Sequence, residues 1–253
     1  MRPTNTIRFI IVLLTAIVVF GRVCIAGTWI DDFSDSTLWD WDGPRMTDEL
    51  SAGVNDGRFN FWGKRENAYL DLMNWKLGTV QDFSLEMQFM VRQMRFPPSS
   101  SWTIIHEAFD KEVEWEFTKG KLEFRFKSSE ADEEEENVVT VSILKWIGDG
   151  HSFKIRIASS SRFKYEKGVW YTLKIERDGD RYTFSVGDIN LATEYHSIPK
   201  GWIGLEFRER CNIWLDDFTV TGPNVPDGGP GRARSVLPAK KLTTTWGKLK
   251  TRN

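Results

Sequence analysis

The chain has 253 residues, of which 40% are hydrophobic, 13% aromatic and 28% charged, a composition that supports one or two folded domains and excludes wholesale disorder. The formal charge is −2, but residues 27–222 alone carry 24 basic and 35 acidic residues. Such a segment repels a phosphate backbone, so the composition disfavours nucleic-acid binding by the globular body.

The N-terminus has the pattern of a secretory signal peptide. Arg2 and Arg8 precede the apolar run 9–20, and the small residue Ala26 fits the last position before a cleavage site. The apolar run is shorter than the roughly 20 residues that a membrane-spanning helix needs. We therefore predict that residues 1–26 are a signal peptide and that the protein is secreted or lies in the periplasm or cell envelope. An uncleaved anchor is the alternative.

Short segments in which apolar and polar residues alternate follow one another along the body, as expected of half-buried strands. Turn signals such as Asp178-Gly179-Asp180 separate them, and no long stretch has helical periodicity. The sequence therefore predicts an all-β domain over residues 27–222, built as a sandwich of two antiparallel sheets. The predicted strands are 85–91, 113–117, 122–126, 153–157, 171–175, 182–186, 203–207 and 213–215.

The sequence predicts structural roles for Cys211 and for the C-terminal residues 223–253. Cleavage after residue 26 leaves Cys211 as the only cysteine, which excludes an intrachain disulfide and, in an apolar strand, indicates a buried, unreactive thiol. Residues 223–253 begin with a Pro- and Gly-rich stretch and carry seven Lys or Arg. We predict a disordered linker and basic tail there, with contact to the cell envelope as a hypothesis for the tail.

Three stretches resemble the concanavalin A-like lectin and glucanase superfamily. They are Trp29-Ile-Asp-Asp-Phe-Ser34 near the start, the Trp- and aromatic-containing hairpin 168–186, and Ile213-Trp-Leu-Asp-Asp-Phe-Thr-Val-Thr-Gly222 near the end. The resemblance covers about residues 28–222 and implies a jelly-roll sandwich. The superfamily includes lectins, glycosidases, laminin-G-like adhesion modules and 3-keto-disaccharide hydrolase-type domains, so it leaves the function open.

One segment has the residue types of a glycosidase centre. In Glu112-Val-Glu-Trp-Glu-Phe117, alternate side chains share a face of a strand, which brings three carboxylates together. Retaining glycosidases use two carboxyl groups about 5–5.5 Å apart. The segment resembles the E-x-D-x-E strand of laminarinase- and lichenase-type β-glucanases, which implies that Glu112 is the nucleophile, Glu114 the middle carboxylate and Glu116 the acid/base. Glu114 departs from the pattern, which has Asp. The alternative is an exposed polar strand face.

Sugar binding requires aromatic platforms for the apolar face of a pyranose and polar groups for its hydroxyls. The chain contains twelve tryptophans, enough to supply platforms besides the core. Trp62 and Trp102 lie near the ends of segments and are candidate platforms. Arg92, His106 and Arg125 are candidate hydroxyl contacts. Core packing is the alternative for each aromatic residue.

A structural calcium ion is a further hypothesis. Asp32 comes from the predicted first strand and Asp217 from the last, so the two carboxylates approach each other if the terminal strands pair. Calcium prefers such hard oxygen ligands. The alternative is that both side chains cap turns or face solvent.

Together these observations favour a secreted carbohydrate-binding or glycan-processing sandwich whose partner is a polysaccharide or other glycan. Two alternatives stay open: a retaining glycoside hydrolase that uses Glu112 and Glu116, and a non-catalytic adhesion or structural module of the cell envelope. Whether the protein is an enzyme is left undecided by the sequence. If it is one, a glycoside hydrolase is the expected class.

Overall fold

The computed structural model describes residues 26–35, 38, 40–42, 50–64, 68–94, 100–108, 120–128, 137–147, 153–158, 161–196, 198 and 200–230. This part of the chain forms sixteen strands and no helix, which confirms the predicted all-β class. Accordingly, the described residues include no helix suited to crossing a membrane.

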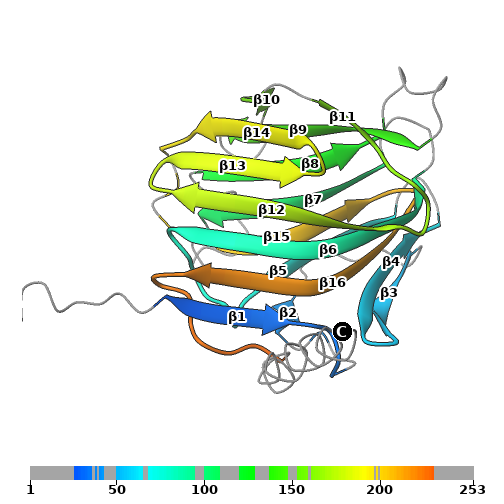
Figure 1. Ribbon diagram of the computed structural model, residues 1–253, viewed down its shortest axis with the longest axis horizontal. Helices are drawn as coiled ribbons and strands as arrows, with labels where there is room; N and C mark the ends of the chain where they lie inside the picture. Colours follow the sequence, from blue (N-terminus) through cyan, green and yellow to red (C-terminus); the bar gives the residue numbers. More distant parts are fainter. Residues whose placement is uncertain are drawn as a thin grey trace, which may run out of the picture.

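The strands form two antiparallel sheets stacked face to face, with sheet A in front and sheet B behind in Figure 1. Sheet A contains β1 (Gly27–Asp31), β3 (Leu50–Asn55), β4 (Arg58–Gly63), β6 (Phe83–Met94), β12 (Trp170–Asp178), β13 (Arg181–Val186), β14 (Ile189–Glu194) and β16 (Cys211–Gly222). Sheet B contains β2 (Trp41–Asp42), β5 (Tyr69–Asn74), β7 (Ser101–Ala108), β8 (Gly120–Lys127), β9 (Val138–Ile147), β10 (Phe153–Arg156), β11 (Ser161–Lys164) and β15 (Trp202–Arg208).

The chain crosses repeatedly between the two sheets. Sheet A has the order β14-β13-β12-β6-β16-β4-β3, with β1 also beside β16, and sheet B has the order β10-β9-β8-β7-β15-β5-β2, with β11 beside β9. Strand β6 of sheet A thus lies in sequence between β5 and β7 of sheet B. The terminal strands β1 and β16 pair from Gly27 opposite Gly222 to Asp31 opposite Phe218, so the first and last strands of the sandwich are neighbours in sheet A.

Two-residue turns join consecutive strands where the sequence provides residues that tolerate a positive φ. Asp178 pairs with Arg181 across the β12–β13 turn, in which Gly179 has φ 59°. At the β3–β4 turn, Asp56 and Gly57 have φ 52° and 70°. An Asp-Gly pair with both φ values positive is typical of the turn that matches the twist of an antiparallel hairpin.

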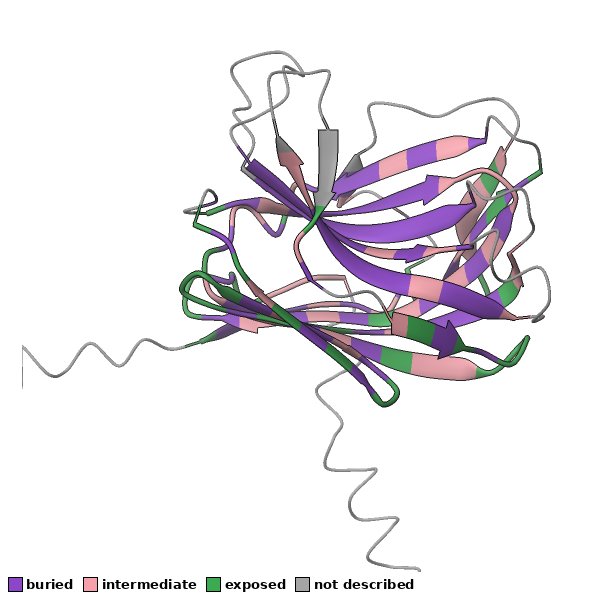
Figure 2. Ribbon diagram, turned by 90° about the horizontal axis from the view of Figure 1, so that it is seen from above, coloured by how far each residue is buried: buried purple, intermediate pink, exposed green. Residues whose placement is uncertain are grey.

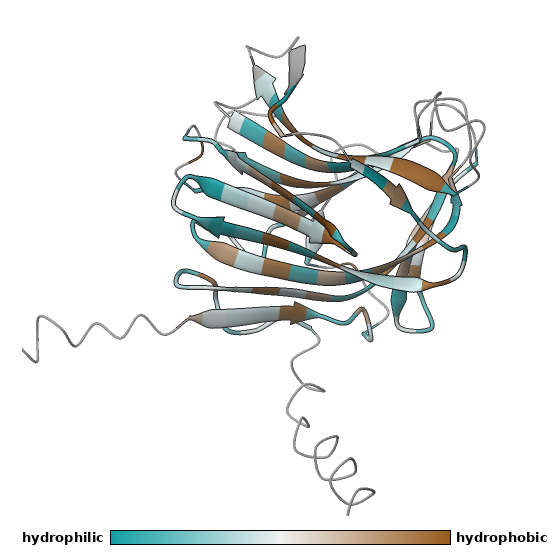
Figure 3. Ribbon diagram, turned by 45° about the horizontal axis from the view of Figure 1, so that its top comes forward, coloured by the Kyte–Doolittle hydropathy of each residue, from teal (hydrophilic) through white to brown (hydrophobic). Residues whose placement is uncertain are grey.

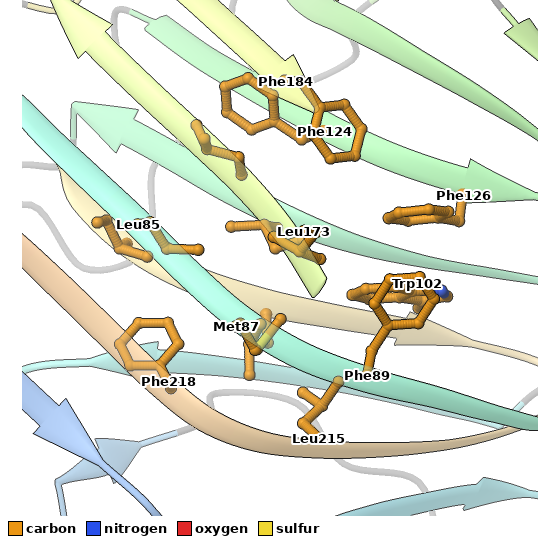
Figure 4. Close-up of a cluster of buried hydrophobic side chains, with 14 of the residues drawn as sticks. Leu85, Met87, Phe89, Trp102, Phe124, Phe126, Leu173, Phe184, Leu215 and Phe218 are labelled. Carbon is orange, nitrogen blue, oxygen red and sulfur yellow. The ribbon is translucent and has the colours of Figure 1, made fainter. Parts of the chain in front are cut away.

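The core lies between the inner faces of the sheets and is rich in aromatic rings (Figure 4). Trp102 of β7 stacks on Phe126 of β8 with ring centroids 4.3 Å apart, and Phe89 of β6 packs against both from sheet A. Cys211 is 1% exposed, and burial raises the pKa of its thiol. The thiol is therefore buried and held in its unreactive form, as predicted.

The folded domain continues beyond residue 222, so the prediction of a disordered linker from residue 223 is wrong for residues 223–230. Val225 is buried, and the Asp227 carboxylate accepts a hydrogen bond from the amide of Thr28. The amide of Ile30 donates to the carbonyl of Gly228 at 3.1 Å. A side chain on Gly229 would meet the Ile30 carbonyl oxygen at 2.0 Å, so glycine is required for this close approach to β1.

Candidate functional site

The two sheets differ in how far their outer faces are buried. Along β13 of sheet A, buried and more exposed residues alternate, as the sequence predicts for a strand with one face in water. Figure 3 shows this alternation as changes of hydropathy along the sheet A strands. In sheet B, residues 101–107 of β7 are all buried, and Figure 2 shows buried residues along most of this sheet. Sheet B therefore buries residues on both of its faces.

The outer face of sheet B is polar although it is buried. Its central row follows the strand register: Asp71 of β5 lies opposite Glu206 of β15, Glu206 opposite Thr103 of β7, and Thr103 opposite Arg125 of β8. Thr103 is 0% exposed and Glu206 2%. We call the following outward residues the polar face of sheet B: Tyr69, Asp71, Thr103, Glu107, Lys121, Glu123, Arg125, Trp146, Trp202, Glu206 and Arg208.

Lys121 is the cation around which the acidic side chains of the polar face gather. Its ammonium lies 3.4 Å from Glu206 Oε2 and 3.7 Å from Glu123 Oε1. Arg208 Nε donates to the other oxygen of Glu206 at 2.6 Å. Burial lowers the pKa of Lys121, but the charges of Glu206, Glu107 and Glu123 outweigh it, so the pKa is raised. Lys121 is thus charged while buried, and its ammonium compensates the negative charges of Glu123 and Glu206.

Asp71 behaves differently from the other acids of this face. Burial and then the charge of Glu206 raise its pKa to about 6, while the hydroxyl of Tyr69 donates a hydrogen bond to Oδ2 and opposes part of the shift. Its other oxygen, Oδ1, is buried without a hydrogen-bond partner among the described residues. Asp71 therefore holds its proton at a pH where an ordinary Asp has lost it.

The raised pKa of Asp71 predicts a pH-dependent stability. A carboxyl whose pKa is higher in the folded state than its ordinary value of 3.8 contributes stability below about pH 4, and this contribution is lost as the pH rises through about 6. We expect Asp71→Asn to match the parent near pH 4 and to exceed its free energy of unfolding by about 1–3 kcal/mol at pH 7. Urea denaturation of both proteins at several pH values measures this, and parallel profiles would contradict it.

Asp31 provides the background for that comparison. Burial raises its pKa to about 6 as well, against hydrogen bonds from Trp41 Nε1 at 2.7 Å and the Phe33 amide at 2.8 Å. It titrates in both proteins, so only the difference between their profiles reports on Asp71.

Several buried polar atoms of this face lack a hydrogen-bond partner among the described residues. They are Asp71 Oδ1, Thr103 Oγ1, Arg125 Nε and Trp202 Nε1. Almost all buried polar atoms in proteins are hydrogen-bonded to protein or water, so a group of exceptions on one face requires an explanation. These atoms form a set of two donors, one acceptor and one hydroxyl that can be either.

The structure does not test the predicted catalytic segment. Glu112, Glu114 and Glu116 lie outside the described residues. The described strand that follows this segment, β8, pairs with β7 on one side and with β9 on the other.

Trp102 and His106 occupy the core rather than a sugar-binding rim. Both lie on the inner face of β7, at 0% and 1% exposure. Every second side chain of a strand points to the same face, and residues 102, 104 and 106 point toward sheet A. His106 contacts the Tyr182 hydroxyl through Nδ1 at 3.1 Å and the Val80 carbonyl through Nε2 at 3.3 Å. Burial and the charge of Arg177 lower its pKa to about 3, so it is a neutral core residue. Neither side chain reaches the surface.

The other three candidate sugar contacts lie on two different faces. Arg125 belongs to the polar face of sheet B, where burial lowers its pKa. Trp62 and Arg92 lie on the outer face of sheet A, where Trp62 is 45% exposed. Arg92 is exposed and lies 5.3 Å from the centroid of the Trp214 ring. The five candidates therefore do not form one site.

The terminal strands pair as the calcium hypothesis requires, but the carboxylates of Asp32 and Asp217 accept hydrogen bonds from other residues of the chain. Asp32 accepts the amide of Ser34 at 3.0 Å, and Asp217 accepts the side-chain amide of Gln88 at 3.0 Å. Within the described ranges, no three His, Cys, Asp or Glu residues gather as metal ligands. Calcium takes six to eight oxygen ligands, so these residues alone do not complete a site, and the ion stays a prediction.

The architecture is the two-sheet antiparallel jelly-roll sandwich that the sequence predicted, and it is shared with solved structures. No family model matches the chain, and no curated protein matches its sequence. Solved structures do match. The carbohydrate-binding module CBM66 from Bacillus subtilis is 14% identical, with a TM-score of 0.51 over 72% of this chain and 96% of the module.

Two further structures share the fold. A protein of unknown function with a galectin-like fold, also from Bacillus subtilis, is 14% identical with a TM-score of 0.55, over 76% of this chain and 94% of its own. The kappa-carrageenase from Pseudoalteromonas carrageenovora, solved with an oligotetrasaccharide of kappa-carrageenan, is 10% identical with a TM-score of 0.52, over 78% and 94%. At such identities the likeness establishes the fold and leaves the function to the residues of this chain.

Proposed function

We propose that this chain is a secreted carbohydrate-binding or glycan-processing domain that binds its glycan at the polar face of sheet B. The observation that supports this best is the central register row, in which Asp71, Thr103 and Arg125 each have a buried polar atom without a partner. Sugar hydroxyls donate and accept hydrogen bonds, so one extended saccharide provides partners for all three atoms.

Aromatic side chains on the same face support the proposal. Trp202 of β15 lies opposite Glu107, and Trp146 of β9 lies beneath Lys121, whose ammonium is 5.1 Å from its ring centroid. Both rings are partly exposed. Indole rings stack on the apolar face of a pyranose while nearby charged groups bind its hydroxyls. Structural neighbours with this fold include a carbohydrate-binding module and a kappa-carrageenase, which agrees with a glycan ligand.

The burial of the central row favours a second candidate, the non-catalytic module of the cell envelope. Thr103 and Glu123 are 0% exposed, so glycan binding there requires this face to open before a saccharide reaches them. A charged network with this degree of burial can also serve only to fix the pairing of sheet B. The third candidate, a retaining glycoside hydrolase, rests on Glu112 and Glu116 and is decided by activity alone.

Thr103→Val separates the first two candidates. The change is nearly isosteric and removes a hydroxyl that bonds to nothing described, so we expect the free energy of unfolding to stay the same or rise slightly. If the hydroxyl binds glycan, affinity for the preferred polysaccharide falls about tenfold. Affinity electrophoresis of the full chain in gels containing neutral glucans and galactans measures this. Thr172→Val, which removes an exposed hydroxyl from sheet A, is the matched control.

Reducing-end release from the same polysaccharides, beside Glu112→Gln, tests catalysis. Release that disappears in Glu112→Gln assigns a glycoside hydrolase. Binding without release assigns a binding module. A chain that neither binds nor cleaves the neutral polysaccharides, with Thr103→Val unchanged, overturns the proposed site and supports the structural module.

A further inference from the structure

Three tryptophans on the outer face of sheet A are each covered by a cationic side chain. In every pair the cation lies about 5 Å from the centroid of the ring, the distance of a cation–π contact. The pairs are Arg58–Trp170 at 5.2 Å, Arg92–Trp214 at 5.3 Å and Lys64–Trp62 at 5.0 Å. We call these six residues the cation–tryptophan face.

The strand register arranges the three rings along a diagonal. Trp170 of β12 and Trp214 of β16 lie opposite Met90 of β6 from its two sides. On the next strand, Trp214 lies opposite Asn60, two residues before Trp62. The diagonal therefore crosses four adjacent strands, a width of about 14 Å at the usual strand spacing. This is the shape of a track for a linear chain rather than a pocket for one small molecule.

The Trp62 end of the diagonal opens into a pocket of about 360 Å³. Trp62 is 45% exposed, one of two large apolar side chains in the described residues that are so accessible. Gly63 lines this pocket, and a side chain at this position would meet the Glu209 carbonyl oxygen at 1.8 Å, so glycine is required for the close approach of the two backbones. The lining residues are Trp62, Gly63, Lys64, Gln93, Arg210 and Cys211.

Polar groups beside the pocket have unmet bonding capacity. Asn212 lies in register between Trp62 and Gln93, and its Oδ1 is buried without a partner among the described residues. Lys64 and Arg92 have no ion-pair partner there, whereas Arg58 pairs with Asp216 at 3.3 Å. Asp216 is thus paired at the Arg58 end, and the positive charges of Lys64 and Arg92 remain at the Trp62 and Trp214 end.

We propose that the cation–tryptophan face binds an acidic polysaccharide. Sugar rings stack on Trp62 and Trp214, and sulfate or carboxylate groups on the sugars form charge-assisted hydrogen bonds with Lys64 and Arg92. Asn212 Oδ1 accepts a hydrogen bond from a sugar hydroxyl. This acidic-glycan site goes beyond the site proposed above, because the two share no residue and lie on opposite sheets.

Dextran and dextran sulfate form a matched pair of probes, because they share a backbone and differ in charge. We expect the full chain to bind dextran sulfate at least about tenfold more tightly than dextran at moderate salt, and less tightly as salt rises. Trp62→Ala and the double variant Lys64→Gln/Arg92→Gln each weaken binding to dextran sulfate about tenfold, while Trp62→Phe keeps most of it. Alginate as a third probe distinguishes carboxylate from sulfate.

Lys174→Gln is the control for general attraction between charges. Lys174 lies in β12 of the same sheet, is 43% exposed, and pairs with Glu176 rather than with a ring. The basic tail is present in every variant, so its attraction to dextran sulfate cancels in the comparison. Equal losses in Lys174→Gln and in the double variant overturn the proposal, as does equal binding of dextran and dextran sulfate.

Failure of this proposal is distinguishable from failure of the first. Thr103→Val leaves dextran sulfate binding unchanged if the acidic ligand binds to sheet A. Loss of dextran sulfate binding in Thr103→Val, with Trp62→Ala unaffected, assigns the acidic ligand to the polar face of sheet B and overturns this assignment. Thermal unfolding of each variant verifies that the sandwich is intact.

Discussion

Lys121→Met lowers the free energy of unfolding at pH 7 by about 3–5 kcal/mol, the expected cost of removing one partner from a buried charge network. The side chain of Lys121 is 11% exposed, while those of Glu123 and Glu206 are 0% and 2% exposed. Methionine fills nearly the same volume but leaves these carboxylates without their shared cation. Arg208 still bonds Glu206 and Trp146 Nε1 still donates to Glu123, but neither group replaces the ammonium that both carboxylates share.

Two comparisons make this prediction specific. Lys174→Met removes a closer ion pair, with 2.6 Å between Lys174 and Glu176, but both side chains are exposed, so the expected cost is about 0–1 kcal/mol. Lys121→Arg retains the charge and recovers much of the stability. Urea denaturation of the three variants measures the costs. Equal effects of the two Met substitutions would contradict a buried network around Lys121.

The pH dependence of Lys121→Met gives an independent check. The charge of Lys121 lowers the pKa of Asp71, so without the cation that pKa rises further, and the stability that protonated Asp71 provides at low pH is lost as the pH increases. The difference between parent and variant should therefore shrink from pH 7 toward pH 4. A constant difference would indicate lost packing rather than uncompensated charge.

Sheet A was predictable from alternation because its outer face lies in water. The apolar positions of β12, β13 and β16 alternate with polar ones, and these strands were found near their observed places. Alternation does not predict strands β7 and β9. In both, residues of opposite faces are buried, such as Ile104 beside Ile105 and Ile143 beside Leu144, so the sequence does not alternate. The alternation of apolar and polar residues therefore does not identify a strand that is buried on both of its faces.

For a related reason, the sequence pattern does not predict the polar face of sheet B. Glu206 stands between Leu205 and Phe207, which predicts an outward position, and the structure places it there. The pattern of one strand does not show that Asp71, Thr103 and Arg125 come from three other strands to the same row, because strand order depends on crossings between sheets. The outward orientation was readable, but its burial and its neighbours were not.

Composition alone does not predict where the folded domain ends. Pro226-Asp-Gly-Gly-Pro-Gly231 has the composition of a linker, yet Gly229 is required for contact with β1, and Asp227 and Gly228 bond its backbone. Glycine in such a run marks either flexibility or close backbone approach. The apolar Val225 just before it is the sequence feature that favoured the second.

Trp102→Ala lowers the free energy of unfolding by about 3–5 kcal/mol, as expected when a large core side chain is truncated. Its ring lies nearly parallel to Phe126 at 4.3 Å and 4.9 Å from Phe89, contacts that span both sheets. Trp102→Phe costs much less, because the ring stack is retained and the indole N–H, which has no described hydrogen-bond partner, is removed. Trp62→Ala, at an exposed position, changes stability by about 0.5 kcal/mol or less.

The comparison of Trp102 with Trp62 separates packing from recognition for two residues that the sequence placed in one class. Chemical denaturation gives the stabilities of the three variants Trp102→Ala, Trp102→Phe and Trp62→Ala. Affinity electrophoresis without denaturant, at a temperature well below the unfolding midpoint of each variant, gives their glycan binding. A core Trp102 predicts that folded Trp102→Phe binds glycans as the parent does. Loss of glycan binding in Trp102→Phe with unchanged stability would instead place this ring in a binding site, against its 0% exposure.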